Sequence, residues 1–117
     1  VHHLVSVIAS ELRDGKTLGD LIAAAFPGGS ITGAPKSRAM EIIAEIERAP
    51  RGVYCGTIGY LGFNGHADLN IAIRTAQFCN GVARLQGGGG ITARSSPAAE
   101  YEESLTKIRR ILEAFAA

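Results

Sequence analysis

Glycine is the residue that most limits the folds open to this chain, since 15 of its 117 residues are glycine. Many of them fall in two runs, PGGSITGAPK at residues 27–36 and GGGG at residues 87–90. Runs of this kind interrupt regular structure and let backbone amides approach a ligand closely. The chain is therefore predicted to consist of short elements around two glycine loops, and its length suits one domain or part of a larger one.

The composition excludes several classes of protein. Twelve basic and eleven acidic residues leave a formal charge of +1, so neither nucleic acid nor an anionic membrane is a default partner. No apolar run approaches the length of about 18 residues that a membrane span needs, and the first residues lack a signal peptide's pattern. These features favour a cytoplasmic protein. The two cysteines, Cys55 and Cys79, form no CxxC pair and are expected to be free thiols.

Helical periodicity predicts three helices in the first half of the chain. Residues 2–13 carry an apolar residue at every third or fourth position, which is a helical stripe. Thr17 is a suitable cap for a second, short helix that ends before the first glycine run. A third helix is expected to begin near Pro35, where a missing amide hydrogen costs little, and to run to about Arg48.

From Val53 the pattern changes to short runs of β-favouring residues. These runs cover residues 53–63, 69–78 and 82–86, and Asn-Gly pairs at residues 64–65 and 80–81 separate them. Asn-Gly between apolar runs is a strong hairpin signal, so the three runs predict an antiparallel meander. In that register Cys55 would lie opposite about Ala76.

A fourth helix is predicted at the end of the chain. Ser95 or Ser96 can cap it, and Pro97 suits its first turn. Its apolar stripe consists of Tyr101, Leu105, Ile108, Leu112 and Phe115. Helices followed by an antiparallel β-meander and a C-terminal helix place the chain in the α+β class.

The first glycine run is similar to a phosphate-binding P-loop but does not match one. A P-loop needs Gly-Lys-Ser/Thr in direct succession after a strand, whereas Ala34 and Pro35 separate Gly33 from Lys36 and a helix precedes the run. Free amides at the start of the next helix would still suit a phosphate or a carboxylate. The alternative is a connector between helices with no ligand.

Two glutamates on the last helix are candidates for a metal site. Glu100 and Glu103 are three residues apart and therefore project from one helix face, as two oxygen ligands of Mg²⁺ can. The alternative is a solvated face, because Glu103 and Lys107 also form a favourable pair four residues apart.

Arg74 is the other charged residue of interest, since it falls within the apolar run of residues 71–75. A guanidinium in an apolar strand suggests a bidentate partner for a carboxylate, and the alternatives are an internal ion pair or an outward-facing position. Tyr54, at the head of the first β-run, is as typical of a core as of a site. His2 and His3 point in different directions on a helix, so they cannot both serve one site.

Taken together, these segments resemble the C-terminal part of the chorismate-utilising enzymes, the family of anthranilate synthase component I, aminodeoxychorismate synthase component I, and the isochorismate and salicylate synthases. The resemblance covers essentially the whole chain. It rests on VHHLVS (1–6), PGGSITGAPK (27–36), RAMEII (38–43), CGTIGY (55–60), IAIRT (71–75), GGGI (88–91) and EYEE (100–103). The first glycine run and CGTIGY are most similar to the aminodeoxychorismate synthase branch, with anthranilate synthase as the alternative.

The resemblance implies a role for each candidate residue. Glu103, supported by Glu100, would hold a Mg²⁺ ion that bridges to the ring carboxylate of chorismate. The substrate's carboxylates would be bound by Arg74 and by the amides near Gly88 and Gly90, with Tyr54 nearby. His3 and Ser30 would match the family's substrate-contacting histidine and loop hydroxyl, which we predict to be catalytic.

The same resemblance implies a reaction and a partner. Chorismate would be aminated to 4-amino-4-deoxychorismate, on the para-aminobenzoate branch of folate biosynthesis, with ammonia from a glutamine amidotransferase subunit. Arg94 and Leu69 depart from the residues usual in the family, which affects the expected specificity more than the class. Residues 1–117 would be the C-terminal part of a chorismate-binding domain without its upstream part, inactive alone and prone to self-association. The competing hypothesis is a non-catalytic module that binds a small anion.

Overall fold

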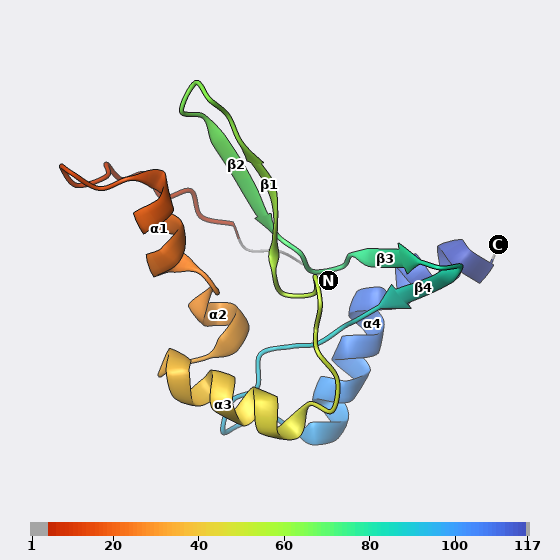
Figure 1. Ribbon diagram of the computed structural model, residues 1–117. Helices are drawn as coiled ribbons and strands as arrows, with labels where there is room; N and C mark the ends of the chain where they lie inside the picture. The colour runs from red at the N-terminus through yellow and green to blue at the C-terminus, as the bar shows by residue number, and fades with distance from the viewer. Residues whose placement is uncertain (1–4, 117) are drawn as a thin grey trace. The chain divides into compact units, whose positions relative to one another are not determined.

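The computed structural model of the chain describes residues 5–116, and the chain divides after Ile46 into two compact units, each described here by itself. The first unit contains the helices α1 (Leu18–Ala25), α2 (Gly29–Thr32) and α3 (Lys36–Ile46). The second contains two hairpins and a long helix (Figure 1). The α+β class predicted from the sequence is confirmed, with helices first, antiparallel strands next and a helix at the end.

The first helix begins where its cap predicts. The Thr17 hydroxyl accepts a hydrogen bond from the Asp20 amide at 3.2 Å, and the Asp20 carboxylate accepts one from the Thr17 amide at 2.8 Å. This reciprocal capping box satisfies two amides that the first turn leaves without helical partners. The third helix, α3, also begins as predicted, since the Ala39 amide donates to the Pro35 carbonyl at 3.0 Å.

The helix predicted over residues 2–13 is wrong where the structure describes it, because residues 5–13 form no helix. Val5, Val7 and Ile8 are 82%, 95% and 89% exposed, so the apolar stripe has no surface to pack against within the described residues. A helix of fewer than about 12 residues is marginal in water without such packing. A helical pattern of apolar residues is therefore not enough to form a helix at residues 5–13.

Four short strands form two separate hairpins in place of one three-stranded meander. Strand β1 (Thr57–Leu61) pairs antiparallel with β2 (Ala67–Ile71), and β3 (Ala76–Cys79) pairs with β4 (Val82–Leu85). Both predicted Asn-Gly turns connect the strands of a hairpin. At the second turn Asn80 and Gly81 have φ of 51° and 74°, the left-handed values that a two-residue hairpin turn requires.

The run predicted as one strand over residues 69–78 is interrupted by residues 72–75. Arg74 has φ of 51°, in the left-handed region, so the strand cannot continue through it. The strand register also differs from the prediction, which placed Cys55 opposite Ala76. The Cys55 amide instead donates a hydrogen bond to the Ala72 carbonyl at 2.9 Å. Cys55 and Cys79 are free thiols, as predicted.

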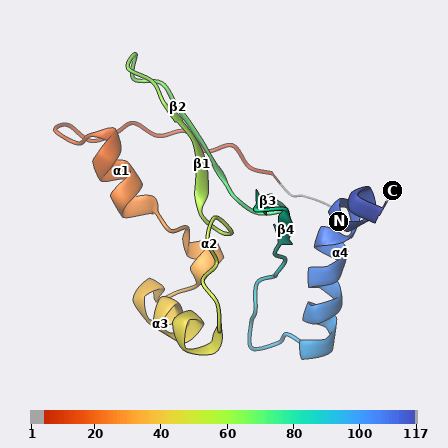
Figure 2. The ribbon, with the colours of Figure 1, turned by 45° about the vertical axis from the view of Figure 1, so that its right-hand side comes forward.

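The helix α4 (Pro97–Ala116) lies beside the second hairpin in both views of the chain (Figure 1 and Figure 2). An edge-to-face contact between Phe78 and Phe115, with ring centroids 5.5 Å apart, joins β3 to this helix. Leu105 and Ile108 of the predicted apolar stripe are half-buried, while Tyr101 is exposed.

Few apolar side chains are covered in either unit. Among residues 5–115, whose burial is described, Ala72 is the one fully buried residue. Large exposed side chains include Ile58, Tyr60, Leu61, Phe63, Phe78, Val82 and Phe115. None of the described helices is long and apolar enough to cross a membrane.

Candidate functional site

A cavity of about 90 Å³ in the second unit brings together residues from four parts of the chain. They come from the turn before β1, the break between β2 and β3, the segment after β4, and α4. The lining consists of Tyr54, Ile73, Arg74, Gln86, Gly87, Gly88, Lys107 and Ile108. Three residues that the sequence nominated for substrate binding, Tyr54, Arg74 and Gly88, thus lie around one cavity.

Tyr54 contacts its neighbours through its backbone amide, its ring and its hydroxyl group. Its amide donates to the Arg51 carbonyl at 3.2 Å, and the Arg51 guanidinium carbon lies 5.9 Å from the ring centroid. A Cβ atom added to Gly88 would lie only 2.8 Å from the Tyr54 hydroxyl, so the ring uses the space that this glycine leaves free. Burial, followed by the neighbouring Cys55, raises the pKa of Tyr54.

Arg51 is itself fixed by a two-pronged ion pair. Its Nε and Nη2 atoms donate to the two carboxylate oxygens of Glu47 at 2.8 and 2.6 Å. These hydrogen bonds lower the pKa of Glu47 and raise that of Arg51. The fork holds the guanidinium at the Tyr54 ring, so the ring is supported by a charged pair that the sequence did not single out.

The sequence predicted that Arg74 would lie inside a strand. In the structure it lies at the break between β2 and β3. Its left-handed backbone belongs to the irregular segment that lines the cavity. A loop position at a cavity leaves a guanidinium better placed to meet a ligand than a strand position within a sheet. The strand break is therefore part of the site.

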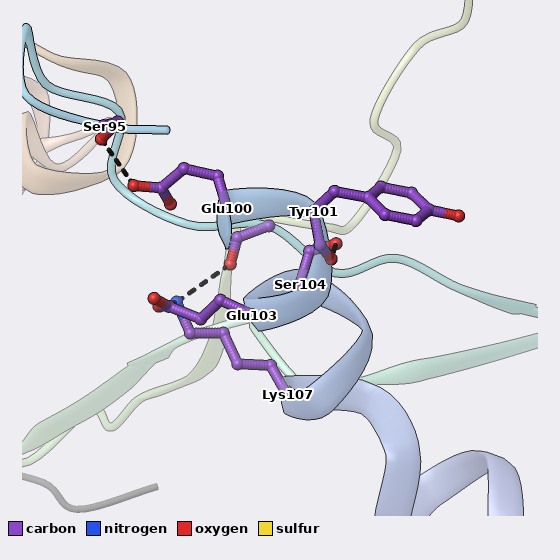
Figure 3. Close-up of polar contacts among 7 residues, drawn as sticks. Ser95, Glu100, Tyr101, Glu103, Ser104 and Lys107 are labelled. Carbon is purple, nitrogen blue, oxygen red and sulfur yellow. Dashed lines mark hydrogen bonds and ion pairs between the residues drawn. The ribbon is translucent and has the colours of Figure 1, made fainter. Parts of the chain in front are cut away.

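Lys107 completes the cavity and was considered in the sequence only as a surface partner of Glu103. Its side chain is 22% exposed, and its ammonium lies 2.5 Å from Glu103 Oε1 and 3.3 Å from the Gly88 carbonyl oxygen. Figure 3 shows the lysine reaching back along α4 from the turn that follows Glu103. The spacing of four residues was visible in the sequence, but the contact with the glycine loop was not.

Glu100 and Glu103 project from the same side of α4, whereas Tyr101 points away from them (Figure 3). A Cβ atom added to Gly89 would lie 3.1 Å from Glu100 Oε2 and 3.7 Å from Glu103 Oε1. The Lys107 ammonium lies 3.3 Å from the same point, so the space that Gly89 leaves free is bordered by two carboxylate oxygens and by this ammonium. A cation bound there would have to displace Lys107 from Glu103. The other oxygen of Glu100, Oε1, accepts a hydrogen bond from the Ser95 hydroxyl at 2.5 Å.

This pair of carboxylates fits the requirements of a Mg²⁺ ion in its donor chemistry. Magnesium prefers oxygen ligands and is commonly bound by one or two carboxylates together with water and substrate oxygens. The described residues contain no group of three or more His, Cys, Asp or Glu side chains that could hold a metal ion. Beyond these two carboxylates, a cation would need further oxygen ligands such as water or substrate oxygens.

Three further residues were predicted for the site: His3, Ser30 and Gly90. His3 lies outside the described residues. Ser30 is exposed in α2, which belongs to the first unit. Gly90 is also exposed, and a Cβ atom there would meet no other atom within 4 Å. Their predicted roles rest on the sequence alone.

Comparison with known proteins places the chain in a family. A family model described as chorismate binding enzyme matches residues 1–113. The anthranilate synthase component 1 of Mycobacterium bovis is 50% identical over 117 residues, which cover 100% of this chain and 23% of that protein. The aminodeoxychorismate synthase component 1 of Escherichia coli is 54% identical over 113 residues, which cover 97% of this chain and 25% of that protein.

A third relative, anthranilate synthase component 1 3 of Haloarcula marismortui, is 54% identical over 114 residues, with 97% of this chain and 23% of that protein covered. The chain thus spans about a quarter of the length of the relatives it matches. Both synthase names occur at similar identity, so identity alone does not separate the two.

Proposed function

The chain belongs to the family of chorismate-binding enzymes, and from that premise we propose that it forms part of an aminodeoxychorismate synthase. This enzyme would convert chorismate and ammonia to 4-amino-4-deoxychorismate, for para-aminobenzoate and folate biosynthesis. The second candidate is anthranilate synthase, which the similar identity of its relatives supports.

The observation that carries the proposal is the meeting of Arg74, Lys107 and Gly88 at one cavity. Chorismate carries two carboxylates. A guanidinium can bind one of them in a bidentate manner, and a lysine ammonium acts as a compact point charge for another. Amides of the glycine loop are proposed to add neutral donors, because residues without side chains let a ligand approach the backbone closely.

Each residue of the candidate site has a defined task. Arg74 and Lys107 bind and orient the two carboxylates of chorismate. Tyr54, whose own ring is supported by Arg51, borders the ring of the substrate. Glu100 and Glu103 would hold Mg²⁺, which when bound offsets the negative charge of a substrate carboxylate and polarises it. His3 and Ser30 are proposed to contact the substrate near the reacting carbon, as expected from the sequence.

Ammonia is proposed to come from a glutamine amidotransferase, and the protein is proposed to act in the cytoplasm. We also propose that residues 1–117 in isolation self-associate, because large apolar side chains such as Phe63 and Phe78 are exposed. Size-exclusion chromatography with light scattering is expected to give a mass above 12.2 kDa. A monodisperse monomer that turns over chorismate would contradict this part of the proposal.

The reaction is tested with the native polypeptide that carries this chain. It is incubated with chorismate, Mg²⁺ and ammonium, with and without EDTA, and the products are identified by mass spectrometry. We expect 4-amino-4-deoxychorismate only where metal is present. Anthranilate would select the second candidate, and unchanged chorismate from a folded polypeptide would favour a binding module that performs no chemistry.

Two variants separate an enzyme from such a module. Glu103→Ala is expected to abolish metal-dependent turnover while the fold persists. Glu102→Ala is the matched control, since Glu102 is exposed on the same helix and is not among the three residues nearest to the Gly89 position. Binding of chorismate that survives Glu103→Ala and needs no metal would support the module.

A further inference from the structure

Ser95 is the residue outside the cavity whose contacts bear most directly on the carboxylate pair. It is half-buried in the segment between the glycine loop and α4. Its hydroxyl donates to Glu100 Oε1 at 2.5 Å, a contact drawn in Figure 3. This is a short, charge-assisted hydrogen bond, which is stronger and more directional than one between neutral groups.

The orientation of the Ser95 hydroxyl is determined by its neighbours. The hydroxyl oxygen accepts a hydrogen bond from the Thr92 amide at 3.0 Å. The Ser95 amide donates in return to the Thr92 carbonyl at 3.0 Å. The Thr92 hydroxyl oxygen also lies 3.4 Å from the Ser95 hydroxyl, whereas Glu100 Oε1 lies 2.5 Å away. A hydroxyl has a single proton, and we assign it to the shorter contact, with Glu100.

This contact separates the two oxygens of the Glu100 carboxylate. Oε1 is occupied by Ser95, whereas Oε2 faces the Gly89 position, 3.1 Å from where a Cβ atom would be. Lys107 Nζ and Glu103 Oε1 lie 3.3 and 3.7 Å from the same point. A divalent cation there would take the place of the Lys107 ammonium, which is paired with Glu103. Without Ser95 the carboxylate would be free to rotate about its χ angles and would lose this preference.

We propose that Ser95 is a positioning residue that holds Glu100 so that its Oε2 atom faces a divalent cation beside Glu103 and Gly89. The proposal rests on the metal role given to the two glutamates under the proposed function. Ser95 itself contacts neither the cation nor the substrate. Groups that orient a metal ligand in this way typically change metal affinity by about 10-fold or more when they are removed.

The test measures cation binding without substrate and without turnover. The native polypeptide is titrated with Mn²⁺, free Mn²⁺ is followed by electron paramagnetic resonance, and Mg²⁺ competes for the same site. Ser95→Ala is expected to weaken Mn²⁺ binding about 10-fold. Ser95→Thr keeps the hydroxyl and is expected to bind nearly as the unmodified protein does. Ser96→Ala is the matched control, because Ser96 is adjacent and exposed and keeps its carbonyl contact with the Glu100 amide.

A double-mutant cycle shows whether Ser95 acts through Glu100. In a Glu100→Gln background, Ser95→Ala is expected to cause no further loss of Mn²⁺ affinity. Ser95→Cys keeps the side-chain shape but has a weaker hydrogen-bond donor. It is therefore also expected to weaken Mn²⁺ binding, and it replaces Ser95→Ala if that variant disturbs folding. Unchanged Mn²⁺ affinity in Ser95→Ala or Ser95→Cys would overturn the proposal, as would a full loss that persists in the Glu100→Gln background.

The outcome is separable from that of the proposed function. Metal-dependent turnover of chorismate with no effect of Ser95→Ala on Mn²⁺ binding would overturn the positioning role alone. Mn²⁺ affinity that does not respond to Glu100→Gln or Glu103→Gln would overturn the metal role of the glutamates, and the role of Ser95 with it.

Discussion

The ammonium group of Lys107 lies 3.3 Å from the carbonyl oxygen of Gly88, and this contact ties the second glycine loop to the last helix. The same ammonium is paired with Glu103, one turn earlier on α4. A single side chain therefore links the wall of the cavity to the carboxylate pair. This link brings residues from two distant parts of the sequence into one candidate site.

Replacement of Lys107 is expected to loosen this loop. Lys107→Met keeps most of the aliphatic stem but removes the ion pair and the bond to Gly88, so the free energy of unfolding should fall by about 1 kcal/mol, given the partial exposure of the pair. Urea denaturation of the native polypeptide measures the change. Arg110→Met is the control on the same helix, since Arg110 is 94% exposed and 3.8 Å from Glu113. Equal effects of the two substitutions would contradict the role given to Lys107.

A side chain at Gly88 is expected to displace Tyr54. In Gly88→Ala the new Cβ atom would lie 2.8 Å from the tyrosine hydroxyl, so the ring or the loop must shift, at a cost of about 1–3 kcal/mol in unfolding free energy. Gly90→Ala is the matched comparison in the same loop, because its Cβ atom has no neighbour within 4 Å. Its stability should change by no more than about 0.5 kcal/mol. The idea fails if both variants unfold at the same denaturant concentration.

The capping box of α1 predicts a pH effect. Hydrogen bonds from the Thr17 hydroxyl and amide lower the pKa of Asp20, so the folded state binds a proton there less readily than the unfolded state does. The stabilisation is present above the ordinary aspartate pKa and is lost as the pH falls through the lowered value. Carboxyl NMR titration should show this lowered pKa. It should move toward the ordinary value in Thr17→Val and remain low in Thr17→Ser.

Tyr54 predicts an effect at the opposite end of the pH scale. Burial raises its pKa, so the folded state keeps the phenolic proton at a pH where the unfolded state has lost it. Stability should therefore fall as the pH rises above about 10, the ordinary tyrosine value. Thermal unfolding between pH 8 and pH 11 measures this decline, which should be smaller in Tyr54→Phe. Tyr101→Phe leaves Tyr54 in place and should retain the full decline.

Features set by neighbouring residues were predictable from the sequence. Thr17 and Asp20 define a helix start within four residues, and the two Asn-Gly pairs define their hairpin turns. The helix expected at residues 2–13 was wrong over its described part, because a periodic pattern does not reveal whether any surface is present to cover the stripe. The left-handed backbone of Arg74 was equally hidden, since arginine has no preference for it.

The candidate site was predictable only in part for a related reason. Arg74 was nominated by its charge within an apolar run, and Tyr54 and Gly88 through the family resemblance; all three line one cavity. Lys107 and Ser95 were not, because their contacts depend on how the loop after β4 folds back along α4. Such contacts join residues that local patterns treat separately, and only a three-dimensional arrangement displays them.

The break at residues 72–75 also makes the pairing of each hairpin independent of the other. Because β2 and β3 belong to different two-stranded sheets, a change of loop length at the Asn64-Gly65 tip need not propagate into the pairing of β3 with β4. An insertion within residues 72–75 would instead move Arg74 relative to the cavity wall. Natural length variation among relatives is therefore expected at the tip of the first hairpin and not at this junction.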